Sequence, residues 1–212
     1  MFLYILIILT LLIFYKLFRE FGKTKNIVIN VNAEEMGKLV KTFQSIAPEK
    51  IKKAIETPKF QNKLNSDISK LKEKIPTFAP AAFLKKAEEM FDAIFDAFAN
   101  SNHKILKSML TESLYKSFSA QIQKREIGNL RQEISIKHKK TVIDKIQLLT
   151  NKAKLTILFD VSQMNVMLNS EGISFDNPQK LYRNVLHNWV FEKKFNSKED
   201  WILSKTSSIE RQ

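Results

Sequence analysis

The chain has 212 residues, a formal net charge of +13 and no cysteine. The lack of cysteine excludes disulfides, thiolate nucleophiles and cysteine-based zinc or iron–sulfur sites, and it is consistent with a reducing compartment. The three histidines, His103, His138 and His187, are far apart in the sequence and have no metal-ligand spacing. There is also no Gly-rich phosphate loop, so the sequence predicts no metal ion and no other cofactor.

The positive charge is concentrated near the N-terminus. Residues 16–76 contain 14 lysine or arginine residues against 7 acidic ones, whereas residues 77–212 contain 21 against 15. Basic residues next to a membrane gain about 1 kcal/mol each from anionic lipid headgroups. No RNA- or DNA-binding motif accompanies the lysines, so the partner that we expect is an anionic membrane, with nucleic acid contacted only indirectly through ribosomes.

The first segment, residues 1–21, is predicted to be a membrane anchor. Residues 1–15 are apolar except for Thr10, and a helix continued to Phe21 would be about 31 Å long, enough to cross a bilayer. A cleaved signal peptide would need a basic start and small residues at the cleavage site, and the sequence has neither. The basic residues that flank the segment are Lys16, Arg19, Lys23 and Lys25. By the positive-inside rule, they predict a single-pass protein of the inner membrane with its C-terminal domain in the cytoplasm, or in the matrix if the membrane is mitochondrial.

Residues 22–79 are predicted to be a basic, partly helical linker. A short β-branched stretch reads as an extended spacer, and a helix is expected from Asn32 to the residue before Pro48. A second, amphipathic helix follows Pro58, with lysines beside its apolar face. That face consists of Phe60, Leu64, Ile68, Leu71 and Ile75. It needs a surface to cover, which can be the bilayer, a partner protein or the C-terminal domain of the same chain.

Residues 80–207 are predicted to form one α+β domain, followed by a tail at 208–212. Helical periodicity predicts a long core helix from Phe83 to Phe98, a short one around Leu106, and a third that ends at Gly128. The period then changes to two, which predicts antiparallel strands. We expect these strands at residues 142–148, 154–161, 185–191 and 201–203. The helices should pack on one face of the sheet.

Several short segments resemble the Tim44-like domain family. They are Phe83-Leu-Lys-Lys-Ala-Glu-Glu-Met-Phe91, Phe98-Ala-Asn-Ser-Asn102 with Leu106 and Leu110, Trp189-x-Phe191, and Trp201-x-Leu203. The order of anchor, charged linker and domain is similar to that of the bacterial membrane-anchored members, of the TimA type. The resemblance implies an NTF2/cystatin-like fold in which a curved sheet wraps a long helix and leaves an apolar pocket. It also implies an adaptor role at an energy-transducing membrane, but recruitment of an Hsp70 motor belongs to a part of mitochondrial Tim44 outside this domain.

The candidate pocket or core residues are aromatic side chains and one histidine from the predicted strands. They are Phe159, His187, Trp189, Phe191 and Trp201. Aromatic residues at period two are more often core than pocket lining, since burial of each contributes about 1.5 to 3 kcal/mol. Asp160 is a conceivable catalytic carboxylate, but alternation places it on the face opposite Phe159.

These patterns favour a non-enzymatic adaptor, tethered to the membrane, that binds a protein client or anionic lipid. One alternative is an NTF2-like carrier or enzyme with an apolar pocket at Trp189. Another is a membrane tether for ribosomes, since a related domain occurs in a mitochondrial large-ribosomal-subunit protein. The basic run from Lys137 to Lys140 is either a contact patch or a solvated strand end.

Overall fold

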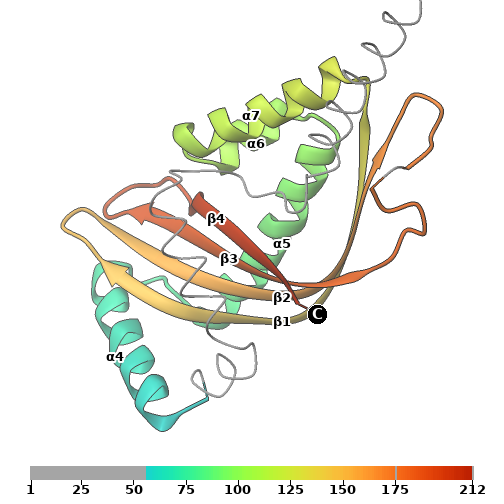
Figure 1. The fold of residues 1–212 in the computed structure, drawn as a ribbon. Coiled ribbons are helices and arrows are strands. Elements are labelled where there is room, and N and C mark those ends of the chain that lie inside the picture. Colours follow the sequence, from blue (N-terminus) through green and yellow to red (C-terminus); the bar gives the residue numbers. More distant parts are fainter. Residues whose placement is uncertain (1–55, 175, 212) are drawn as a thin grey trace, which may run out of the picture.

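The computed structural model describes residues 56–174 and 176–211. Its elements follow one another as four helices and then four strands (Figure 1). They are α4 (Pro58–Lys74), α5 (Pro80–Ala99), α6 (His103–Met109), α7 (Glu112–Ile127), β1 (Arg131–Leu148), β2 (Lys152–Leu168), β3 (Arg183–Lys194) and β4 (Ile202–Arg211). This order confirms the predicted α+β class. The predicted anchor at residues 1–21 and the predicted helix at 32–47 lie outside the described residues.

The four strands form one antiparallel sheet in the order β1-β2-β3-β4. Each strand is followed by its neighbour in space, as in a meander, although the connection between β2 and β3 is a long loop at residues 169–182. The sheet curves around α5, which lies across its concave face (Figure 1). A register shift between His138 and Lys140 marks a bulge in β1, a feature that bends a strand.

Helix α5 supplies the centre of the hydrophobic core. Its buried residues recur at helical spacing along one face. They are Phe83, Ala87, Met90, Phe91, Ile94, Ala97 and Phe98. The helix begins with Pro80 in its first turn, where the missing amide proton costs nothing. At its end, the amide of Asn102 donates to Ala97 O (2.7 Å), and Ser101 has a positive φ of 53°, as in a Schellman motif.

Helix α7 ends in the same way and leads into the sheet. Gly128 is its C-cap, as the sequence predicts, but the left-handed residue is Asn129, whose φ is 50°. The amide of Leu130 donates back to Arg125 O (3.0 Å) and closes the motif. The chain therefore turns sharply, and β1 begins at Arg131, the residue after Leu130.

Helix α4 packs on the domain itself. Leu71 and Ile75 are buried in the main core, and Leu64 and Ile68 are partly buried against it. Phe60, at the start of the helix, is half-buried. Of the three surfaces that could cover this amphipathic face, it is the chain's own domain against which the face packs. The predicted domain start at residue 80 therefore lies inside the packed unit.

All four predicted strands are shorter than the observed ones, and the two edge strands differ the most in where they begin or end. β1 begins at Arg131, eleven residues before the expected start at 142, and β4 continues to Arg211 through most of the expected tail at 208–212. Both extensions are rich in polar and charged residues, which hid the alternation. Hydrogen bonding to neighbouring strands stabilises them instead, as Ile134 opposite Asn165 and Ile209 opposite Leu186 illustrate. Within the described part of the chain, no helix has the length and apolar character needed to span a membrane.

Candidate functional site

The concave face of the sheet carries four of the five residues that the sequence singled out. The register pairs Phe159 with His187 and places Trp189 and Phe191 two and four positions further along β3, on the same face. All four are buried: Phe159 and Phe191 are 0% exposed, Trp189 is 1% exposed and His187 is 5% exposed. Their side chains point toward α5.

Side chains of helix α5 fill the space around Trp189, where the sequence allowed either a packed core or an apolar pocket. The ring of Phe91 lies with its centroid 4.5 Å from both Phe159 and Trp189 and 5.1 Å from His187. Phe95, one turn further, lies 5.5 Å from His187 and 5.7 Å from Trp189. Side chains thus occupy the region around Trp189, and the geometry favours the core interpretation of these aromatics.

Trp201 belongs to a second ring cluster at the other end of α5. Its ring lies 5.0 Å from Phe83 and 6.1 Å from Phe78, and Phe83 in turn meets Phe191 edge to face at 5.9 Å. Phe78 stands in the connection between α4 and α5, so this cluster fixes α4 to the domain. Aromatic pairs of this kind add about 0.5 to 1.5 kcal/mol beyond their area burial.

His187 is a structural histidine in this arrangement. Its Nε2 forms a hydrogen bond with Gln163 Oε1 (2.8 Å) on the neighbouring strand. Burial lowers the pKa of His187 from 6.5 to about 3, with a further contribution from His138. The imidazole is therefore neutral near pH 7 and donates its proton to Gln163. Asp160 lies on the opposite face of the sheet from His187 and forms an ion pair with Arg211. The His187 imidazole and the Asp160 carboxylate therefore do not form a common site.

We expect the stability of the protein to fall as the pH decreases from about 6.5 toward 3, because the unfolded chain binds a proton at residue 187 where the native state does not. One such group contributes a slope of at most about 1.4 kcal/mol per pH unit. His187→Gln removes this titration, while its amide can still donate to Gln163. Urea unfolding at a series of pH values should therefore show a steeper loss for the wild type. Parallel curves for the two proteins would contradict this assignment.

The described residues do contain an open groove, at a place that the sequence did not indicate. It lies between the C-terminal half of α5 and the first half of β1 and has a volume of about 440 Å³. Its lining consists of Asp92, Phe95, Asp96, Ala99 and Asn100 from α5 and Gln132, Glu133, Ile134, Ser135 and Ile136 from β1. The apolar members Phe95, Ala99, Ile134 and Ile136 are only partly buried. The groove therefore offers some apolar surface within a lining that is more polar than apolar.

The rim of the groove is acidic. Asp92 contacts His138 Nε2 (2.8 Å). Glu133 also lines the groove, but alternation along β1 places its side chain on the other face of the sheet, where it forms an ion pair with Lys180 (3.0 Å). Asp96 accepts a hydrogen bond from the amide of Asn100 (2.9 Å) but has no basic partner within ion-pair distance among the residues described. Apolar side chains beside an unneutralised carboxylate suit a ligand that combines apolar and cationic groups.

A buried arginine holds the end of this groove. Arg125 of α7 donates to Gln132 Oε1 (2.6 Å), Phe98 O (2.7 Å) and Ser101 Oγ (3.0 Å). The Gln132 amide then donates to Asn165 Oδ1 (2.8 Å) on β2. Burial lowers the pKa of Arg125, yet a guanidinium remains charged, and it lies at the C-terminus of α5 where a cation is favoured. Arg125 thus joins α7, α5 and β1.

Sequence reasoning missed the groove because it used α5 only for its apolar stripe. The signal was the opposite side of the same helix, where Asp92 and Asp96 stand one turn apart. That spacing shows two carboxylates on one face. It cannot show that the polar first half of β1 lies beside them, since this contact joins residues about forty positions apart.

The family model of the Tim44-like domain matches residues 64–208. Among solved structures, the chain is similar to the crystal structure of the intermembrane space region of chloroplast protein ARC6, at 12% identity and a TM-score of 0.43, covering 60% of this chain and 97% of that one. It is also similar to a domain of unknown function with a cystatin-like fold from Nostoc punctiforme, at 12% identity and a TM-score of 0.32, covering 60% of this chain and 76% of that one. A comparison with curated proteins gave no match. Because the matched segment takes in most of α4 and all of the elements from α5 to β3, with β4 as far as Ser208, the chain belongs to the Tim44-like domain family.

Proposed function

We propose that this protein is a non-enzymatic adaptor, tethered to the cytoplasmic side of the inner membrane, that holds a protein client in the groove between α5 and β1. The family suggests a membrane-associated, adaptor-type role. The tether rests on the apolar segment at residues 1–21 and its basic flank. The client site rests on the groove.

The observation that carries the proposal is the contrast between the two candidate sites. The aromatic residues around Trp189 are in contact with Phe91 and Phe95, which counts against a ligand cavity at Trp189 for an NTF2-like carrier or enzyme. The groove beside them is open, and both apolar side chains and carboxylates line it. Its chemistry favours a client segment in which basic and apolar side chains alternate along one surface.

The binding mode follows from the same geometry. Phe95 is partly exposed and lines the groove, and the next residue, Asp96, lines it as well and is exposed. A client's apolar side chain would cover Phe95 while a lysine or arginine approached Asp96. Such rim charges mainly raise the association rate and the selectivity of binding, and buried aromatic contacts contribute most of the affinity.

The test is site-specific crosslinking in native membranes. A photoreactive amino acid at Asn100, which lines the groove, should give a discrete adduct that mass spectrometry identifies as a protein with a basic, apolar segment. Asp96→Lys should reduce the yield about tenfold, since reversing one charge changes such an interaction by about 1 to 2 kcal/mol. Glu126→Lys, an exposed position on α7, is the matched control and should leave the yield unchanged.

If the adduct forms equally in the protein without a further substitution, in Asp96→Lys and in Glu126→Lys, the groove is not the client site. If position 100 forms no protein adduct in membranes, the adaptor proposal itself is wrong.

A further inference from the structure

The outer edge of β1 is open along the first half of the strand. Among the residues described, β1 pairs with β2 alone, and no backbone hydrogen bond joins residues 132–136 to any described segment other than β2. Alternate residues of an edge strand direct their amide and carbonyl groups away from the sheet. All five of these consecutive residues line the groove, although their side chains alternate between the two faces. The backbone edge itself therefore borders the groove.

The opposite edge of the sheet is partly closed. Leu110, between α6 and α7, forms a parallel bridge with Leu203 near the start of β4, and the amide of Thr111 donates to Leu203 O (2.9 Å). An open strand edge is a template for an added strand, which supplies the missing backbone hydrogen bonds. Of the two edges, the first half of β1 is therefore the better template.

Residues 26–32 have the sequence of a strand but no strand near them in the sequence to pair with. The segment reads Asn26-Ile-Val-Ile-Asn-Val-Asn32 and has no charged residue. Ile27, Ile29 and Val31 recur at period two, so one side of the extended segment is entirely β-branched and apolar. A helix is expected directly after it, and the four described helices separate it from β1. It can therefore form a strand only by pairing with the sheet of the domain or with another chain.

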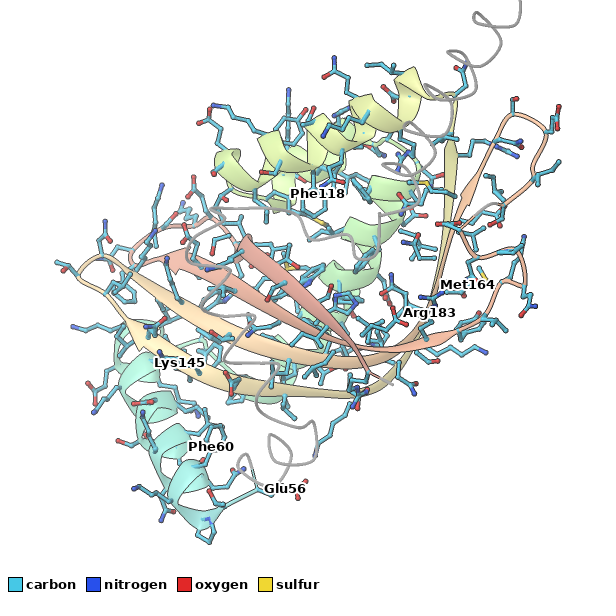
Figure 2. All side chains as sticks on the ribbon, viewed as in Figure 1. Glu56, Phe60, Phe118, Lys145, Met164 and Arg183 are labelled. Carbon is cyan, nitrogen blue, oxygen red and sulfur yellow. The ribbon has the colours of Figure 1, made fainter. Side chains whose placement is uncertain are left out.

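The chain is long enough to bring this segment to the groove. Glu56, the first described residue, forms an ion pair with Lys140 of β1 (3.1 Å). Lys140 is five positions from Ser135, about 17 Å along the strand. The 23 residues between Asn32 and Glu56 span about 34 Å even if they are wholly helical. Figure 2 shows Glu56 below β1 and, well away from α4, Met164, which lies opposite Ser135 on β2.

The segment also matches the groove in chemistry. Among the groove residues, Phe95 of α5 and Ile134 of β1 are apolar and only partly buried, and the apolar side of the segment would cover them. Lys23 and Lys25 directly precede the segment. They would bring positive charge to Asp96, the carboxylate in the groove that has no basic partner among the described residues.

We infer that residues 26–32 bind along the edge of β1 as an added strand and occupy the groove until a client displaces them. The inference deepens the proposed adaptor function, on which it rests for the client. The apolar residues Ile27, Ile29 and Val31 then face α5, and the residues between them lie on the other face of the sheet. Backbone pairing supplies the affinity, whereas the alternate side chains that enter the groove supply the selectivity.

The test uses the natural absence of cysteine in the full-length chain. One cysteine replaces Ser135, whose side chain lies on the face of the sheet opposite α5, and a second replaces each residue of the segment in turn. After mild oxidation in native membranes, mass spectrometry identifies disulfides within one chain. We expect them at even-numbered positions such as Val28 or Asn30. Yields at odd-numbered positions should be about tenfold lower, because neighbouring side chains of a strand point to opposite faces.

The matched control places the partner cysteine on the other edge of the sheet. Ser207 of β4 lies on the same face as Ser135, and Ser207→Cys should give no such alternation. Three results would overturn the inference: no disulfide with the cysteine at position 135, equal yields at even and odd positions, or the same pattern with the cysteine at position 207. Disulfides that join two chains would also overturn it, since a second copy would then supply the strand.

Displacement by the client is tested with proline. Val28→Pro combined with Ile29→Pro removes two consecutive amides, one of which faces β1 in any register. The client adduct at Asn100 should then rise about fivefold when the client is limiting, as expected if the segment occupies the groove in about 80% of molecules. The control exchanges the two residues, as Val28→Ile with Ile29→Val, and should leave the adduct unchanged because both side chains remain β-branched.

The two experiments separate the inference from the proposed function. A client adduct that is unchanged by the two prolines would overturn the competition between segment and client. Absence of a client adduct in every variant, with the alternating disulfides intact, would contradict the proposed client site and leave the added strand in place.

Discussion

Phe91→Ala should lower the free energy of unfolding by about 3 to 5 kcal/mol, the range for truncation of a fully buried Phe. Phe91 is 0% exposed and lies between the sheet and the rest of α5. Its ring contacts Phe95, Phe159 and Trp189, with centroids 4.5 to 4.8 Å away. Truncation leaves a cavity that the surrounding rings, fixed to two strands and a helix, can close only partly.

Urea unfolding followed by tryptophan fluorescence measures this effect directly, because Trp189 and Trp201 are both buried. Phe95→Ala is the matched control. Its ring is half-buried, so we expect a loss of about 1 to 2 kcal/mol from the smaller area removed from the core. Equal losses for the two variants would mean that Phe91 is not the centre of the core.

Arg125→Met should lower the free energy of unfolding by about 3 kcal/mol, although it replaces a charged side chain with an apolar one of similar length. The variant loses three hydrogen bonds and leaves Gln132 Oε1 without its donor in a buried place. An unsatisfied buried polar group costs about 1 to 3 kcal/mol. The variant also removes a cation from the C-terminus of α5 and from its position 5.1 Å from the Phe98 ring.

Arg125→Lys separates the charge from the geometry. A lysine keeps the positive charge but cannot reproduce the two-nitrogen fork, so we expect it to recover about half of the loss. Lys124→Met, the exposed neighbour, should change stability by less than about 0.5 kcal/mol. Because Gln132 lines the groove, Arg125→Met should also reduce the crosslink at Asn100 at temperatures where the variant remains folded. A variant as stable as the wild type would show that the polar network is dispensable.

Local pattern was sufficient for the helices of the core. The spacing of Phe83, Ala87 and Phe91 specifies both that α5 is a helix and which of its sides is buried. Gly128 marked the end of α7, and the alternation around Phe159 and Trp189 identified the two central strands. The family resemblance on these same segments agrees with the family match at residues 64–208.

Pattern failed at the edges of the sheet and at the groove. The first half of β1 has only Ile134 and Ile136 as apolar residues among polar ones, and this alternation is too short to predict a strand. Its strand conformation depends on hydrogen bonding to β2, a partner about thirty residues away. The extension of β4 through Ile209 to Arg211 depends on β3 in the same way.

The sequence by itself determined the family, the α+β class and the long apolar helix. It also determined the concentration of positive charge beside a predicted anchor. Each of these features depends only on the local spacing of residues or on composition. The tertiary structure decided which surfaces remain free. It used the apolar face of α4 on the domain itself and filled the space around Trp189 with Phe91 and Phe95. It also placed Asp92 and Asp96 of α5 beside the first half of β1, where they line an open groove. The physical reason is that availability depends on long-range packing, since a side chain can bind a partner only where no other part of the chain already covers it.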